Sequence, residues 1–216
     1  MLGALEPQAL QASFLSWVSS ISQKLGLDVI HIDGNRRWVP MTGKKNSKRK
    51  HSVSAWNTEH GLVLAQHKVE DKSNEITAVP LLLKLLNLKG AVVTLDAMGT
   101  QTAIASLIQQ AGGEYVLALK GNQGKLYHQV ETWFEQAVAN DWAGIEYSYQ
   151  ETVETGHHRL ETRQVFAVPV SQLPPLHRQS QWVGLTTVVM VKRRRQLWNK
   201  TTTEVCFYIS SQGKRI

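Results

Sequence analysis

The chain has a single cysteine, Cys206, and no long apolar run among its 216 residues. One cysteine cannot form an internal disulfide and makes a cysteine-based metal site a poor fit, so we expect a reducing, cytoplasmic setting. The longest apolar stretch falls far short of the roughly 20 residues that cross a bilayer, so no membrane partner is expected. The first residues lack a basic segment followed by an apolar block, and no secretory signal is predicted.

Motifs of two common enzyme classes are also missing. No Gly-x-Gly-x-x-Gly or Gly-x-x-x-x-Gly-Lys-Ser/Thr sequence follows a predicted strand, which disfavours a nucleotide-binding enzyme. No Gly-x-Ser-x-Gly elbow occurs, which disfavours an acyl-transfer enzyme. We therefore expect no small-molecule substrate.

Basic residues are in excess, with 24 Lys and Arg against 17 acids, a net charge of +7 and a pI near 9.6. This balance favours a polyanionic partner. The excess is clustered in two places. The first comprises Arg36, Arg37, Lys44, Lys45, Lys48, Arg49 and Lys50, and the second is Lys192–Arg195. The alternative for both clusters is a solvated hairpin tip.

Hydrophobic periodicity predicts an α/β fold over the first two thirds of the chain. A helix is expected at 7–25, and a connection at 36–50. A further helix at 75–86 should begin near Val79, because Pro80 interrupts the pattern. Two more helices are predicted at 100–110 and 126–139. Strands are predicted at 27–32, 51–57, 62–69, 90–96 and 115–120.

The last third has a different texture. Strands are predicted at 145–152, 163–170, 183–191 and 204–210, with Pro174 and Pro175 in a loop. We expect three parts: an N-terminal helix at 1–26, a core at 27–140 and a β-rich region at 141–216.

Two of the predicted strands end on an aspartate. Asp33 follows the run Leu27–Ile32, and Asp96 follows Gly90–Leu95. Three antiparallel strands followed by parallel strands with helical crossovers describe a ribonuclease-H-like sheet, whose first and fourth strands are parallel neighbours. The two carboxylates would then meet, and Mg²⁺ or Mn²⁺ would relieve their repulsion and support phosphodiester chemistry. The alternative is that Asp96 only caps the following helix.

The chain resembles the DDE transposases of the H-repeat-associated insertion-sequence family. The resemblance runs from about Phe14 to Ser211. The matching text is Val29–Gly34, His51–Ala55, Gly61–Leu64, Lys68–Val69, Lys72–Ala78, Val93–Met98, Tyr115–Gln123, Glu151–Thr152, Gly156–His157, Arg159, Glu161 and Tyr208–Ser211.

This resemblance implies a ribonuclease-H-like mixed sheet with flanking helices and a β-rich insertion region. It also implies a divalent-metal Asp-Asp-Glu site that cleaves and transfers DNA strands, with insertion-sequence ends and target DNA as partners. Asp33 and Asp96 match the first and second acids. The basic cluster at 36–50 would hold the DNA backbone. The other residues that we expect to contact DNA are Lys72, Asn74, Lys120, Asn122, Gln123, His157 and Arg159. For Lys120, Asn122 and Gln123, ordinary turn chemistry is the alternative.

The family's third acid lies in a His-Trp-x-Ile-Glu-Asn context after the strand that matches Tyr208–Ser211, and this chain has no such text. Glu151, Glu154 and Glu161 are poor substitutes, because the match assigns their segment to the region before the third acid. The sequence therefore predicts a C-terminally truncated transposase, nucleoid-associated through DNA, that lacks strand-transfer activity and is prone to self-association. The alternative is a non-catalytic DNA-binding remnant, or an inhibitor of a full-length transposase.

Overall fold

The computed structural model describes residues 29–39, 48–57, 59, 61–69, 75–156 and 159–213. The expected helix at 7–25 lies outside these ranges. The described residues form two compact units. The first comprises residues up to Gly99 together with Leu107–Glu114, and the second comprises Thr100–Ser106 and the residues from Tyr115 onward.

The first unit is built on a sheet of four described strands in the order β3-β2-β1-β4. β1 (Val29–Val39) pairs antiparallel with β2 (Lys48–Asn57), and β2 pairs antiparallel with β3 (Leu62–Val69). β1 also pairs in parallel with β4 (Val92–Leu95). The predicted arrangement, with the first and fourth strands as parallel neighbours, is confirmed.

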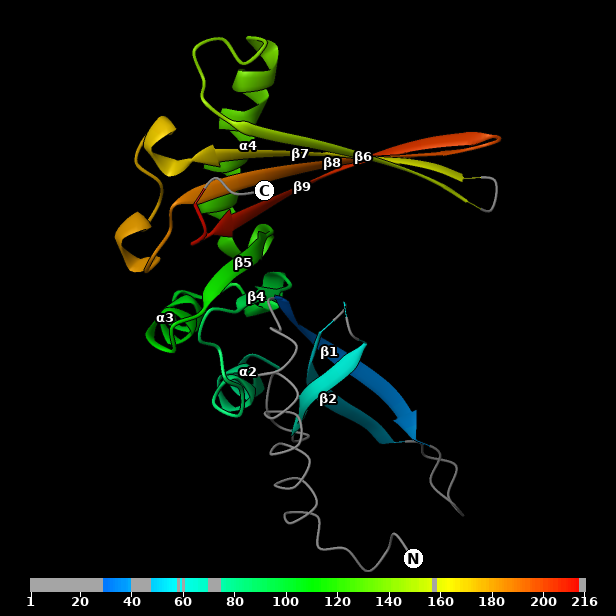
Figure 1. Ribbon diagram of the computed structural model, residues 1–216, viewed down its shortest axis with the longest axis vertical. Coiled ribbons are helices and arrows are strands. Elements are labelled where there is room, and N and C mark those ends of the chain that lie inside the picture. The colour runs from blue at the N-terminus through cyan, green and yellow to red at the C-terminus, as the bar shows by residue number, and fades with distance from the viewer. Residues whose placement is uncertain are drawn as a thin grey trace, which may run out of the picture. The chain divides into compact units, whose positions relative to one another are not determined.

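One face of this sheet is apolar and covered. Alternate residues of β1 and β2, among them Ile30, Ile32 and Val53, are buried, as expected for strands with one face on a core. Helix α2 (Glu75–Leu83) packs against β2 and β3 and buries Val79 and Leu82 (Figure 1).

Two expectations for this unit were wrong. α2 begins at Glu75 and contains Pro80, so burial of its apolar face outweighs the loss of one backbone hydrogen bond. The segment 36–50 is not simply a connection, because 36–39 continue β1 and 48–50 begin β2. Cross-strand pairing continues from Arg36 and His51 to Val39 and Lys48, and it extends both strands into this segment.

The second unit contains an antiparallel sheet in the order β5-β9-β8-β7-β6. β5 is Glu114–Leu119, and it is followed by helix α4 (Gly124–Ala139). The other strands are β6 (Ser148–Gly156), β7 (Arg159–Pro169), β8 (Thr187–Leu197) and β9 (Lys200–Ser210). The predicted β-rich texture of this region is confirmed, and its strands are longer than predicted.

Helix α4 covers the base of one face of this sheet (Figure 1). Phe134 of α4 is buried and stacks on Phe207 of β9, with ring centroids 5.6 Å apart. Next to it, Trp142 stacks on Phe166 of β7 at 4.7 Å. Toward their far ends the four strands β6–β9 extend as a long twisted ribbon (Figure 1).

Short helical turns connect these elements. They are η2 (Ala97–Gly99), η3 (Gly121–Gln123), η4 (Val170–Gln172) and η5 (Gln179–Gln181). Helix α3 (Thr102–Gln110) follows η2 and ends just before Gly112, whose φ of +76° suits glycine. None of the described helices has the length and apolar content that a membrane crossing requires.

Candidate functional site

The register of β1 and β4 brings the two predicted acids together. The last parallel pair joins Ile32 to Leu95, and the next residue on each side is an aspartate, Asp33 and Asp96. Neighbouring strands lie about 4.8 Å apart, so the two backbones approach to roughly that distance. Both side chains are exposed. The expectation that the first strand ends at Asp33 was wrong, since β1 continues to Val39; it is the parallel pairing that ends there.

The two aspartates line the same open hollow, which encloses about 260 Å³ including open solvent. Its other walls come from β1, β2, α2, β4 and η2. They are Ile32, Gly34, Val53, Ile76, Val79, Leu95, Met98 and Gly99. Asp33 and Asp96 are the only ionisable groups among these lining residues, so they set the charge of the hollow.

Asp96 also caps the turn η2. Its Oδ1 accepts hydrogen bonds from the backbone N–H groups of Met98 and Gly99, at 3.1 and 3.3 Å. The capping role considered as an alternative is therefore real, but it does not compete with metal binding. A carboxylate offers about four lone-pair sites, and the cap fixes the side chain in one orientation.

The turn η2 is tightly packed. A Cβ atom at Gly99 would lie 2.5 Å from Leu95 Cδ2 and 2.9 Å from Leu95 Cβ. Only glycine fits at that distance, so Gly99 holds the turn against the end of β4. This close packing positions the Asp96 side chain that caps it.

A side-chain hydrogen bond between β1 and β4 supports the positions of Asp33 and Asp96 from within the sheet. His31 Nδ1 and Thr94 Oγ1, each two residues before an acid, are 2.5 Å apart in a hydrogen bond. His31 lies on the same face of β1 as Asp33, because alternate residues of a strand share a face. Trp56 of β2 packs beside His31, with ring centroids 6.3 Å apart. This row ties β1 to β4 directly below the acids.

The donor set suits a hard cation. Mg²⁺ and Mn²⁺ favour carboxylate oxygens, and Mg²⁺ is commonly held by one or two carboxylates with waters and substrate phosphates as the remaining ligands. The parts of the chain that the structure describes contain no group of three or more His, Cys, Asp or Glu arranged to hold a metal. Asp33 and Asp96 therefore fit a site completed by further ligands.

The other predicted site residues divide into three groups. Lys44, Lys45, Lys72, Asn74 and His157 lie outside the described residues. Arg36 and Arg37 lie in β1 and Lys48, Arg49 and Lys50 in β2, where the strands pair beyond Asp33. Lys120, Asn122, Gln123 and Arg159 belong to the second unit.

The turn after β5 is held by side-chain hydrogen bonds. Gln123 Nε2 donates to the backbone oxygen of Thr100 at 3.0 Å, and Thr100 Oγ1 donates to the oxygen of Ala118 at 2.6 Å. Gln123 thus has a structural role in this turn, whereas Lys120 is exposed.

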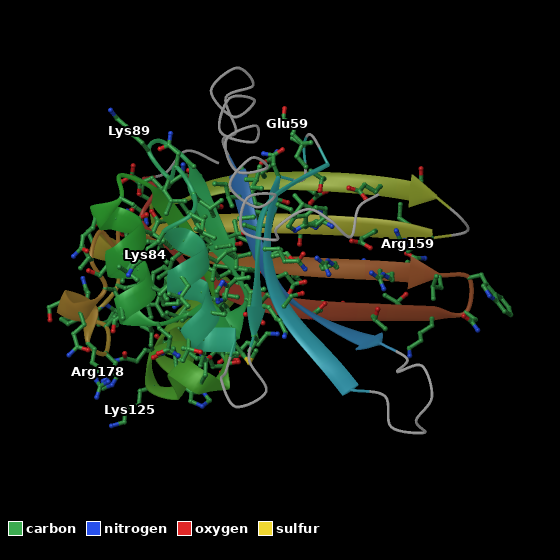
Figure 2. All side chains as sticks on the ribbon, turned by 90° about the horizontal axis from the view of Figure 1, so that it is seen from below. Glu59, Lys84, Lys89, Lys125, Arg159 and Arg178 are labelled. Atoms are coloured by element: carbon green, nitrogen blue, oxygen red, sulfur yellow. The ribbon has the colours of Figure 1, made fainter. Side chains whose placement is uncertain are left out.

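Arg159 belongs to a charged cluster that the sequence did not reveal. It lies in β7, and its Nε is 3.8 Å from Oε2 of the buried Glu161 (Arg159 is labelled in Figure 2). Arg193 and Arg195 of β8 reach the same carboxylate, so the alternative of a solvated hairpin tip at 192–195 does not hold. The period of two in a strand is the signal that could have identified them, because it puts both residues on one face.

Comparison with known proteins identifies a family model and several relatives. The model described as "Transposase DDE domain" matches residues 25–203. The Escherichia coli K12 protein named "H repeat-associated putative transposase YbfD" is 40% identical over 160 residues, covering 73% of this chain and 61% of that protein. A protein of Escherichia coli O157:H7 named "Putative transposase YncI" is 37% identical over 213 residues, covering 96% of this chain and 53% of that protein.

A relative from Xanthobacter autotrophicus, named "Uncharacterized protein in dhlA 3'region", is 36% identical over 211 residues and covers 96% of this chain. Across these three relatives, the chain spans 53–68% of their own length. Among solved structures, a piggyBac transposase synaptic complex with hairpin DNA aligns with 97% of this chain and 41% of that chain. That alignment has 8% identity and a TM-score of 0.41.

Proposed function

The chain belongs to the transposase DDE domain family, and on that basis we propose that Asp33 and Asp96 are two metal-binding acids of a site for DNA strand cleavage and transfer. The observation that carries the proposal is the register of β1 and β4. The parallel pairing ends at Ile32 and Leu95, so the next residue on each strand is an acid that faces the same hollow.

A divalent ion held there would polarise a phosphate oxygen and help to activate the attacking hydroxyl group. The chain's own residues hold the two carboxylates in place. Asp96 is oriented by its cap on the Met98 and Gly99 N–H groups. Asp33 is fixed by the sheet, with β2 paired to it on one side and β4 ending on the other. A cation held by the two acids would relieve their mutual repulsion.

The substrate that we propose is insertion-sequence DNA, both the element's ends and the target. The basic residues 36–37 and 48–50 continue β1 and β2 beyond the acids and would hold the phosphate backbone. A third acid, which the family resemblance assigns to a helix after the strand matching β9, would complete the site. With two acids alone, we propose that these 216 residues bind Mg²⁺ or Mn²⁺ and DNA but do not transfer strands.

The test is a Mn²⁺ titration followed by electron paramagnetic resonance. The wild-type chain should bind Mn²⁺, and Asp33→Asn and Asp96→Asn should each abolish the tightest site. Glu59→Gln is the matched control, because Glu59 is an exposed acid in the turn between β2 and β3 of the same unit (Figure 2). Equal Mn²⁺ binding by all four proteins would overturn the proposal.

A plasmid assay addresses the alternative of a DNA-binding protein without catalysis. Supercoiled DNA incubated with the wild-type chain and Mn²⁺ should remain uncut. Robust nicking that Asp33→Asn abolishes would show that two acids suffice and would refute the proposed lack of activity. DNA binding that ignores both Mn²⁺ and the two substitutions would instead favour the non-catalytic module.

A further inference from the structure

Four arginines of the second unit converge on one buried carboxylate. Glu161 is the third residue of β7 (Arg159–Pro169), and its side chain is only 6% exposed. Arg163 Nη2 and Arg195 Nη2 approach its two oxygens at 3.0 and 3.2 Å, and Arg193 Nε at 3.4 Å. Arg159 Nε completes the set at 3.8 Å. We call these five residues the Glu161 cluster.

Strand register explains why they meet. Glu161 pairs with Arg195, and Arg163 pairs with Arg193, between β7 and β8. Because alternate residues share a face, all five project from the same side of the sheet. The interleaved residues Lys192 and Arg194 project from the opposite side, the one that carries Phe207 and Phe134.

The charges of the Glu161 cluster do not balance. The carboxylate of Glu161 neutralises one guanidinium group. Two further acids lie beside the cluster: Glu154 Oε1 is 4.0 Å from Arg163 Nη1, and Glu204 Oε2 is 3.7 Å from Arg193 Nη1. Both of these acidic side chains are mostly exposed. Burial by itself would raise the pKa of Glu161. The hydrogen bond from Arg195 and the positive charges of Arg195, Arg193 and Arg159 outweigh it and hold that pKa below its usual value. Glu161 is therefore ionised, and its negative charge holds the four arginine side chains close together.

The guanidinium groups remain accessible. The four arginine side chains are between 36% and 46% exposed, while the carboxylate beneath them is covered. Each guanidinium carries five N–H donors, and a carboxylate accepts about four hydrogen bonds in all, so most of the donors point elsewhere. The Nε atoms of Arg163 and Arg193 are themselves buried and have no hydrogen-bond partner among the described residues.

We propose that the Glu161 cluster is a binding surface for the phosphate backbone of duplex DNA, with Glu161 as the positioning residue. Planar guanidinium groups in a fixed array match phosphate oxygens, and a ligand with regularly spaced negative charges relieves the repulsion among them. A purely stabilising ion pair would need only one or two of the arginines. The inference rests on the proposed DNA substrate, but not on the metal site.

The test measures binding of a fluorescein-labelled 20-base-pair duplex of arbitrary sequence by anisotropy, in EDTA, from 50 to 300 mM NaCl. The salt slope is the steepness with which the logarithm of the association constant falls with the logarithm of the salt concentration, and each phosphate contact contributes about 0.9 to it. The double variant Arg193→Gln with Arg195→Gln should therefore lower this slope by about 1.8 and weaken binding about 60-fold at 0.1 M salt. Lys192→Gln with Arg194→Gln is the matched control. It removes the same charge from the same strand but from the opposite face, and should leave the slope unchanged.

A single substitution, Arg159→Gln, tests the same surface with less risk that the variant fails to fold. Arg159→Gln removes the outermost arginine and leaves three others on Glu161, and it should lower the slope by about 0.9 relative to Arg194→Gln. Equal losses in the two double variants, or an unchanged slope in Arg193→Gln with Arg195→Gln, would overturn the proposal. So would labelled polyglutamate responding to these variants when the duplex does not, since the surface would then serve an acidic protein.

Failure of this inference and failure of the proposed function are distinguishable. The duplex titration in EDTA needs no metal, and the Mn²⁺ titration needs no DNA. A wild-type chain that fails to bind Mn²⁺ would overturn only the proposed metal site, and a salt slope that the cluster variants leave unchanged would overturn only this inference. The cluster variants should in turn leave Mn²⁺ binding unchanged.

Discussion

Asp33→Asn should make the metal-free protein more stable while removing its response to Mn²⁺. Asparagine has the shape of aspartate and preserves the pairing of β1 with β2, so the substitution mainly deletes one charge beside Asp96. Two carboxylates on neighbouring strand ends, about 5 Å apart, repel by about 0.8 kcal/mol in water and about 3 kcal/mol at the effective dielectric of a protein surface. Both acids are exposed, so the lower part of this range applies, near 1 kcal/mol.

Thermal unfolding measures both effects. For a chain of this size, about 1 kcal/mol corresponds to roughly 2–4 °C in Tm, so Asp33→Asn should unfold higher than wild type in EDTA by that amount. Mn²⁺ at ten times its Kd should stabilise the wild-type protein by about 1.4 kcal/mol, or roughly 3–6 °C. The variant should show no such gain.

Glu59→Gln serves as the control, because it removes an acid of the same unit that is not part of the hollow. It should respond to Mn²⁺ as the wild-type chain does. A lower Tm for Asp33→Asn in EDTA, combined with an unchanged response to Mn²⁺, would refute the reasoning. Asp33 would then be structural and the two carboxylates would not share an ion.

Three further predictions concern stability. Gly99→Ala should destabilise the protein by about 1–3 kcal/mol in urea unfolding, since its Cβ has no room, whereas Gly121→Ala, with open space around it, should change little. Phe134→Ala should cost about 3–5 kcal/mol, and Trp198→Ala, at an 89% exposed position, less than about 0.5. The folded-state pKa of Glu161 is lowered, so its stabilising contribution is complete above the unfolded value near 4.5 and lost as pH falls through the folded one. Glu161→Gln should therefore make the free energy of unfolding fall less steeply with pH below 4.5. The same pH dependence in the variant and the wild-type protein below pH 4.5 would contradict this.

Local sequence patterns predicted most of the elements and the positions of both acids. Gly90–Asp96 predicted a short buried strand that is followed by an acid, and β4 with Asp96 directly after it has that form. The succession of three antiparallel strands and a parallel fourth predicted that Asp33 and Asp96 would be neighbours, and the register of β1 and β4 puts them side by side. These inferences succeeded because burial and turn chemistry act over a few residues.

The ends of strands were harder to predict, because pairing with a neighbour decides them. The basic residues Arg36, Arg37 and 48–50 show no hydrophobic alternation, yet they extend β1 and β2 because each strand supplies the other's hydrogen bonds. The strand predicted at 183–191 stopped before Lys192–Arg195 for the same reason, and these residues lie inside β8 between two paired neighbours.

The sequence by itself determined the class of fold, the family and the neighbouring positions of Asp33 and Asp96, since each depends on short ordered motifs. Only the tertiary structure showed that Asp96 also caps a turn and that four arginines surround Glu161. Residues 161 and 195 lie far apart in the chain, and their contact depends on the register of β7 against β8. A shift of that register by one residue would turn the arginines to the other face, and the register is set by the pairing of the whole strands rather than by the residues next to Glu161.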